Sequence, residues 1–234
     1  MARRKKIVLI ISLTTLPVAL IIAARLLKFY IIYTIPTMGM YPTIEPNELI
    51  FASSLITPKK NDLVSYKASP LSFVQENPRD IAEILGRIVA VPGDKLEIKN
   101  GLLYISDKMV DDTMNLAYSY FIEQDVADGG YMFPSYELQA YSEDTLIVNT
   151  SPELLKKTLR NELILNRIIA GPSDFIHPEI FNCPESSKWS IDNFGPVIVP
   201  ADHFFIMGDN RSNSADSRFR GFVSKDNIIA VKLW

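Results

Sequence analysis

The most informative stretch of this chain is Met207-Gly208-Asp209-Asn210-Arg211-Ser212-Asn213-Ser214-Ala215-Asp216-Ser217-Arg218. Most of its residues are Gly, Asp, Asn or Ser, which turn tightly and hydrogen-bond to nearby backbone. The apolar run Phe204–Met207 leads into it and predicts a strand that ends in a polar corner. For a generic polar stretch, an exposed loop with solvated charges is the more common structure. A braced, hydrogen-bonded corner is the alternative.

Other short runs rich in Val, Ile and aromatic residues predict further strands. They are Leu49–Ser53, Asp62–Lys67, Arg87–Val91, Val197–Val199 and Asn227–Leu233. Two alternating runs, Lys95–Lys99 and Leu102–Ile105, flank Asn100-Gly101, which is a strong signal for a two-residue hairpin turn. The pattern predicts a mostly β, antiparallel domain.

The segment 111–188 gives weaker signals and is expected to be a mixed α/β insertion. It holds one predicted helix, Pro152–Leu165, with Ser151 as its N-cap. The apolar face of this helix is formed by Leu154, Leu155, Leu159 and Leu163.

The N-terminus has the composition of a membrane anchor. Four basic residues, Arg3 to Lys6, precede the uncharged run Ile7–Ala24, which as a helix would rise about 27 Å. Arg25 and Lys28 close the run, and Tyr30 and Tyr33 are expected as interfacial aromatics. A cleaved secretory signal is the alternative, although its apolar core is usually shorter. The basic residues favour a single-pass protein with a cytoplasmic N-terminus.

Composition excludes several classes of protein. The net charge of the 234 residues is −3 even with the basic N-terminus, so a nucleic-acid binder is not expected. The single cysteine, Cys183, excludes an intrachain disulfide and a cysteine-based zinc cluster. His177 and His203 lack metal-ligand spacing. We expect neither a metal nor a cofactor.

Three blocks together resemble the bacterial type I signal peptidase family. The first is Ile35–Thr43, similar to the family's IPSxSMxPT, and the second is Gly86–Asp94, similar to KRxxGxPGD. The third runs from Asn193 to Arg218, similar to NFGPxxVP…MGDNRxNSxDSR. The resemblance favours a braced corner at Met207–Arg218. It implies a cytoplasmic tail at 1–6, an anchor at 7–29, a signal-peptidase-like β domain at 30–110 and 189–234, and an inserted cap subdomain at 111–188.

Proteins of this family cut signal peptides from secreted chains with a serine–lysine dyad. A serine hydroxyl attacks the scissile carbonyl, and a buried neutral lysine accepts its proton. In this chain the nucleophile position is Gly39 and the general-base position is Gly86. The resemblance therefore implies that neither catalytic group is present.

The residues that support the dyad in the family are largely retained. They are Thr37 at the oxyanion hole, Met40 and Pro42 at the substrate-groove turn, Arg87 after the base position, and Ser214 and Asp216 beneath the site. We expect Ser214 and Asp216 to join a structural network with Arg211 or Arg218. Two departures, Asn47-Glu48 and Arg220, are interpreted as affecting local turns only.

The first hypothesis is a catalytically inactive, membrane-anchored family member with an extracytoplasmic main domain. It would bind signal-peptide-like extended segments or a secreted or assembly partner protein, and it could complement an active signal peptidase paralogue. The second is an active serine endopeptidase with relocated or partner-supplied groups. The candidate hydroxyls are then Thr37, Ser53 and Ser54, and the candidate bases are Lys67 and Lys95. The third is a structural subunit of a membrane complex.

Overall fold

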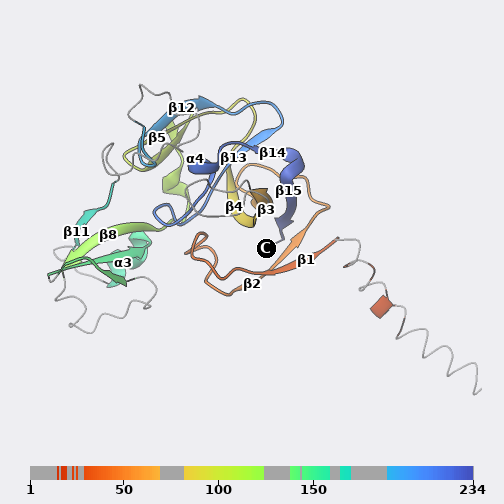
Figure 1. Cartoon of the computed structure of the whole chain (residues 1–234), viewed down its shortest axis with the longest axis horizontal. Coiled ribbons are helices and arrows are strands. Elements are labelled where there is room, and N and C mark those ends of the chain that lie inside the picture. The colour runs from red at the N-terminus through yellow and green to blue at the C-terminus, as the bar shows by residue number, and fades with distance from the viewer. Residues whose placement is uncertain are drawn as a thin grey trace, which may run out of the picture.

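The structure is a computed structural model of the chain. It describes residues 29–68, 82–123, 138–142, 144–158, 164–169 and 189–233, together with residues 15, 17–19, 23 and 25. Its strands form three sheets that are built from antiparallel pairs (Figure 1). The expected mostly β, antiparallel fold is confirmed.

The largest sheet has seven strands in the order β1-β2-β15-β3-β4-β13-β14. Their bounds are Ile31–Thr34 (β1), Leu49–Ser53 (β2), Leu63–Ala68 (β3), Ala82–Ala90 (β4), His203–Met207 (β13), Val223–Ser224 (β14) and Ile228–Lys232 (β15). Strands from both ends of the described chain therefore lie side by side in one sheet. The 3-10 helix η3 (Lys225–Asn227) joins β14 to β15, and the short helix α4 (Ser217–Arg220) follows the polar stretch after β13.

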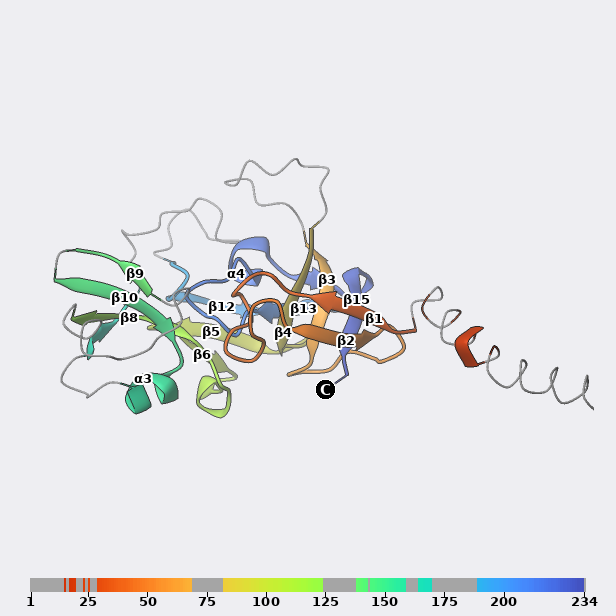
Figure 2. The same ribbon diagram turned by 90° about the horizontal axis from the view of Figure 1, so that it is seen from below.

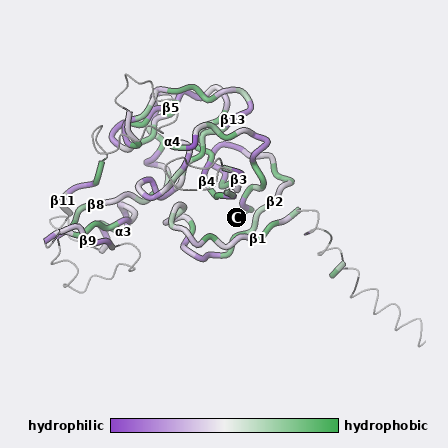
Figure 3. Tube along the Cα trace, in the orientation of Figure 1, coloured by the Kyte–Doolittle hydropathy of each residue, from purple (hydrophilic) through white to green (hydrophobic). Residues whose placement is uncertain are grey.

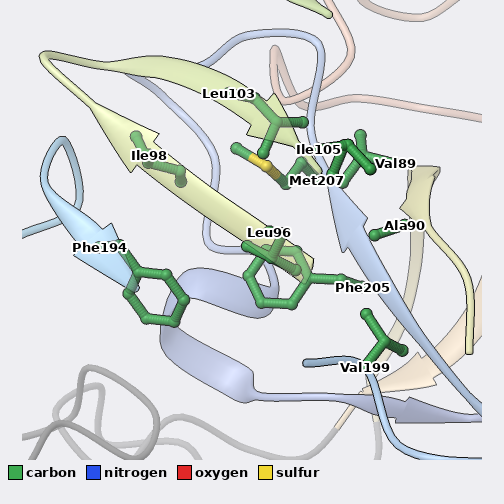
Figure 4. Close-up of a cluster of buried hydrophobic side chains, with 10 residues drawn as sticks. All are labelled: Val89, Ala90, Leu96, Ile98, Leu103, Ile105, Phe194, Val199, Phe205 and Met207. Carbon is green, nitrogen blue, oxygen red and sulfur yellow. The ribbon is translucent and has the colours of Figure 1, made fainter. Parts of the chain in front are cut away.

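A second sheet of four strands has the order β12-β5-β6-β7. Its strands are Lys95–Lys99 (β5), Leu102–Ile105 (β6), Lys108–Met109 (β7) and Phe194–Ile198 (β12). The predicted hairpin between β5 and β6 is confirmed, because Asn100 and Gly101 both have positive φ, 50° and 70°. Side chains of this sheet pack against those of β4 and β13 in one buried cluster, where Phe194 and Phe205 lie 5.8 Å apart between ring centroids (Figure 4).

A third sheet, order β11-β8-β10-β9, lies at one end of the molecule (Figure 2). It contains Tyr118–Glu123 (β8), Leu138–Ala140 (β9), Thr145–Thr150 (β10) and Ile164–Arg167 (β11), with η1 (Asp111–Thr113) before it and α3 (Pro152–Thr158) between β10 and β11. The Ser151 hydroxyl accepts a hydrogen bond from the Leu154 N–H, as expected for the N-cap. The predicted end of this helix is wrong, because Ile164 and Leu165 belong to β11.

Most predicted strands are present with boundaries shifted by a residue or two. Arg87–Val91 corresponds only to the second half of β4, and β1 was not predicted. Hydrophobic and hydrophilic residues interleave along the described trace, as expected for strands with one buried face (Figure 3).

The predicted anchor at 7–29 lies almost entirely outside the described residues. In the part of the chain that is described, no helix combines the length and apolar character that crossing a membrane requires.

Candidate functional site

A cavity of about 530 Å³ opens between the chain that continues from β1 and the first half of β4. Its third wall is the polar stretch that follows β13. The described lining residues are Tyr33–Met40, Tyr66, Glu83–Leu85, Asn213–Asp216 and Arg220. Four of the expected supporting residues therefore meet around one cavity, together with Gly39; they are Thr37, Met40, Ser214 and Asp216.

The first half of β4 has an open edge at this cavity. β3 pairs with β4 from Ala82 to Arg87, whereas β13 pairs with β4 on its other side only between Arg87 and Ala90. Among the described strands, none pairs with Ala82–Gly86 on the side away from β3. β1 is likewise an edge strand of the same sheet. We call this gap between β1 and Ala82–Gly86 the seam. Its unpaired edge suits an added strand.

Gly39 lies on the cavity wall with open space beside it. A Cβ atom at this position would have one close neighbour, the Asn213 carbonyl oxygen at 3.9 Å, which is an ordinary contact. The Gly39 carbonyl oxygen accepts a hydrogen bond from the Asn210 N–H at 3.1 Å. The backbone at Gly39 is thus held against the polar stretch, and a serine side chain fits there without displacement.

Gly86 is enclosed by its neighbours. A Cβ atom at this position would lie 2.5 Å from Cγ2 of Ile206 and 3.3 Å from Cε1 of Tyr66. Ile206 is fully buried in the cluster behind the sheet. A larger residue at 86 therefore forces Ile206 to move, and the space next to this glycine is already filled.

A third glycine, Gly208, permits the close approach of two segments. A Cβ atom here would overlap the carbonyl oxygen of Gly39 and the side chain of Ser214. Only glycine allows the two backbones to come this close.

Asp216 organises the polar stretch beneath the cavity. Its carboxylate accepts hydrogen bonds from the Ser214 hydroxyl at 2.7 Å and from the Gly208 N–H at 3.1 Å. It also receives two bonds from the Arg218 guanidinium, at 2.9 and 2.8 Å. Burial raises the pKa of this carboxyl, but the charge and hydrogen bonds of Arg218 outweigh it, and the net effect lowers the pKa. The expected braced corner is confirmed, with Arg218 as the cation.

The alternative partner, Arg211, binds elsewhere. Its Nη1 donates to both carboxylate oxygens of Asp111 at 2.6 Å, and both residues are buried. Asp111 precedes the third sheet, so Arg211 joins the polar stretch to that region. Of the two arginines that the sequence offered for this network, Arg218 pairs with Asp216 and Arg211 pairs with Asp111.

Arg87 also has a structural role. Its Nε and Nη2 donate to the two oxygens of Asp209 at 2.7 and 2.5 Å, and the Thr43 hydroxyl donates to Asp209 Oδ2 at 2.5 Å. These bonds fasten the β1–β2 connection, at Thr43, and β4, at Arg87, to the polar stretch. Pro42 is half-buried beside Thr43 and is not among the cavity-lining residues.

Most of the alternative catalytic groups lie away from the cavity. The Ser53 hydroxyl donates to the Phe29 carbonyl at 2.7 Å, and Lys95 pairs with Asp107. Neither they nor Ser54 and Lys67 are among its described lining residues, which include no lysine. Thr37 alone of these candidates lies at the cavity.

The sequence did not reveal several residues of the cavity wall. Tyr33, expected at a membrane interface, lies in β1, and its hydroxyl is 2.9 Å from the Ser65 hydroxyl. Burial, followed by a hydrogen bond with Glu83, raises the pKa of Tyr33 to about 12. Arg220, interpreted from sequence as a local-turn residue, lines the cavity and corrects that interpretation. In the sequence, the departure of Arg220 from the family pattern was the signal that could have pointed to its place at the cavity.

The backbone conformation of Asn47 accounts for the other departure from the family pattern, Asn47-Glu48. It has φ 67°, a left-handed conformation that glycine adopts freely and that asparagine tolerates. The change is therefore local to this turn, as expected.

Comparisons with known proteins show the family of this chain. The sequence profile of the family described as "Signal peptidase, peptidase S26" matches residues 5–234. The chain is 28% identical over 227 residues to the signal peptidase I of Aquifex aeolicus (strain VF5), covering 89% of this chain and 77% of that protein. It is 26% identical over 221 residues to the signal peptidase I of Buchnera aphidicola subsp. Schizaphis graminum, covering 86% and 67%.

Among solved structures, a signal peptidase I from Enterococcus faecalis V583 covers 75% of this chain and 97% of its own, with 19% identity and a TM-score of 0.33.

Proposed function

The chain belongs to the signal peptidase, peptidase S26, family, and we propose that it binds signal-peptide-like segments in the seam without cutting them. The proposal assigns Gly39 to the nucleophile position and Gly86 to the general-base position. The remaining site residues then act as a binding frame.

The main support for this proposal is the packing around Gly86, which leaves no room for a lysine. A lysine there has to begin with a Cβ atom 2.5 Å from Ile206 Cγ2, a separation that atoms do not adopt. The buried volume next to the base position is thus filled by a core side chain. Because both members of a nucleophile–base pair act as a unit, loss of the base alone removes most of the catalytic rate.

The chemistry of the remaining wall also favours binding. Thr37 is the candidate hydroxyl at the cavity, but no lysine is found among the described lining residues. A threonine hydroxyl is a weak nucleophile unless an adjacent base removes its proton. Asp216 cannot act as that base, because Arg218, Ser214 and Gly208 already donate to its carboxylate.

The open edge supplies the means of binding. An extended segment added beside Ala82–Gly86 forms main-chain hydrogen bonds that need neither a serine nor a lysine. Side chains of such a segment alternate between the two faces of the sheet. One face presents Tyr33 and Leu85, and the other presents Ile84 and Tyr66.

The proposed setting is the cytoplasmic membrane, with the segment 7–29 as anchor, the N-terminus in the cytoplasm and the main domain outside it. Secreted or assembly partner proteins, or an active paralogue, are the proposed sources of the bound segment.

Filling the cavity tests the function. Gly39→Leu places a larger side chain into open space and is expected to abolish binding of a fluorescently labelled signal peptide while the unfolding midpoint stays unchanged. Thr57→Leu, at an exposed position outside the cavity, is the matched control and should bind as the natural chain does. Equal binding by both variants would show that the peptide does not occupy the seam.

A further inference from the structure

One side of the seam is an apolar surface that the described chain leaves partly uncovered. Tyr33 of β1, Ile35 after it and Leu85 of β4 all line the cavity, and each of them is only partly buried. They pack against one buried hydrophobic cluster, formed by Met40, Ile44, Ile50 and Leu63. We call Tyr33, Ile35 and Leu85 the apolar wall. Apolar surface that borders a core in this way is stabilised when a further apolar group covers it.

Polar groups of the cavity are bonded within the protein. The Tyr33 hydroxyl lies 2.9 Å from the hydroxyl of Ser65, so the polar end of this side chain already has a partner. The Ser214 hydroxyl donates to the Asp216 carboxylate at 2.7 Å. A ligand side chain is therefore not required to satisfy these groups.

The charges at the cavity cancel. Glu83 and Arg220 are of opposite sign, and Asp216 pairs with Arg218 at 2.8 Å. Arg220 Nε also donates to the Ala215 carbonyl oxygen at 2.8 Å. The described lining thus has no excess of either sign that would offset the loss of water from a charged side chain. An uncharged side chain is favoured.

The open edge of β4 points to an extended segment as the occupant. Among the described strands, none pairs with Ala82–Gly86 on the side away from β3, and the main-chain groups of a free edge are complementary to another strand. Leu85 pairs with Ser65, whose hydroxyl contacts Tyr33, so these residues share one face of the sheet. Alternate side chains of an added segment point to that face.

The space beside this edge is larger than small side chains fill. The cavity volume of about 530 Å³ lies within the range of sites that enclose a whole small molecule, about 300–1,000 Å³. Gly39 contributes no side chain to it, and its Cβ position has one neighbour within 4 Å, the Asn213 carbonyl oxygen at 3.9 Å. An alanine of the bound segment would add one methyl group to this volume.

We propose that the segment bound in the seam places a large apolar side chain, of the size of leucine, against the apolar wall. This inference rests on the proposed binding function and specifies which segments the seam selects. An alanine at the same position covers little of the apolar wall, whereas a leucine removes much of that surface from water. The affinity for a segment with leucine at this position should therefore be about tenfold higher.

A leucine scan of a short peptide tests this selection. In a fluorescently labelled parent peptide of Ala and Ser, Leu replaces one Ala at a time, and the affinity of the full-length chain for each peptide is measured. A gain of about tenfold is expected at one position, or at positions two apart, because only alternate side chains reach one face of the sheet. An equal gain at every position indicates nonspecific adhesion and overturns the proposal. A parent peptide that binds as tightly as every Leu peptide overturns it as well.

Substitution in the apolar wall identifies the surface. Leu85→Phe enlarges a wall residue and should lower the affinity ratio of the best Leu peptide to the parent from about ten to about one. Leu102→Phe makes the same change at a partly buried position of β6 in the second sheet, and this matched control should keep the ratio near its original value. Ile35→Ala removes apolar surface from the same wall without adding bulk, so it should also lower the ratio, and it decides the matter if Leu85→Phe does not fold.

The outcomes separate this inference from the binding function. An unchanged ratio in the folded wall variants overturns the proposed selection but leaves the binding of extended segments standing. Failure of all peptides, parent and Leu-substituted, to bind the full-length chain overturns the binding function and this inference with it.

Discussion

At the residue scale, the two glycines of the site differ in their surroundings. Gly39 faces open space, whereas Gly86 faces the side chains of Ile206 and Tyr66. Placing a serine at 39 is thus a small change, while placing a lysine at 86 requires the core to rearrange.

This asymmetry predicts the stability of single variants. Gly39→Ser should change the free energy of unfolding by less than about 0.5 kcal/mol, as expected for a substitution in open space. Gly86→Ala should destabilise the fold by about 1–3 kcal/mol through overpacking. The measurement is urea denaturation of each variant.

A double-mutant cycle identifies the clashing residue. Ile206→Ala alone opens a cavity and is destabilising, but combined with Gly86→Ala it should recover part of the loss, with a coupling of at least about 0.5 kcal/mol. Strictly additive effects would mean that Ile206 does not fill the space beside residue 86.

Loss of the buried ion pair between Asp216 and Arg218 should lower the stability of the fold strongly. Asp216→Asn leaves the buried Arg218 without its counter-charge and should reduce the free energy of unfolding by about 3–5 kcal/mol. Asp107→Asn breaks the exposed pair with Lys95 and should cost less than about 1 kcal/mol. Similar losses in the two variants would contradict the structural role given to Asp216.

The same carboxyl predicts an acid-sensitive fold. Its pKa is lowered in the folded chain, so its contribution is complete above the unfolded value, about 3.9 for aspartate, and is lost as pH falls through the folded value. Unfolding free energy should therefore decline below about pH 4, and Asp216→Asn should flatten this decline. Denaturation curves at a series of acidic pH values measure both slopes.

At the scale of elements, the sequence predicts strands well where a turn marks their ends. Asn100-Gly101 locates β5 and β6 because both residues have the positive φ of a two-residue hairpin turn. β1 has no such boundary, because Ile31–Thr34 continues directly from the apolar N-terminal run. The length of the helix after Ser151 was likewise overestimated, since leucine spacing continues past Thr158 although the chain turns into β11.

The cavity wall was only partly predictable for a related reason. Motif residues such as Ser214 and Asp216 are contiguous, and their side chains bond within the same stretch. Tyr66 and Glu83 come from the paired strands β3 and β4, and their place at the seam depends on where β13, which comes much later in the chain, stops pairing with β4. Local sequence carries no information on that point.

The open edge predicts a specific response to peptide. Amide hydrogen exchange in Ala82–Gly86 should slow when a signal peptide is added, because main-chain bonds form along the edge. Amides of β10 in the third sheet, away from the cavity, should exchange as before. Protection of β10 with no change at β4 would place the peptide elsewhere.

At the scale of the whole molecule, the polar stretch after β13 joins the largest sheet to the third sheet. Asp209 binds Arg87 of β4, Arg211 binds Asp111, and Asn210 exchanges side-chain hydrogen bonds with Asn149 of β10 at 3.0 and 2.6 Å. These contacts connect the seam to the third sheet. Under the proposed function, these contacts hold the frame of the binding site in shape without a serine at 39 or a lysine at 86.

The central claim is that the seam holds a signal peptide and leaves it intact. The direct measurement is the mass of a signal-peptide-bearing precursor after prolonged incubation with the purified full-length chain in molar excess. We predict that the precursor mass is unchanged while the two proteins co-purify. Appearance of the mature protein and a released signal peptide, lost again in Thr37→Val, would contradict the account and identify Thr37 as a working nucleophile.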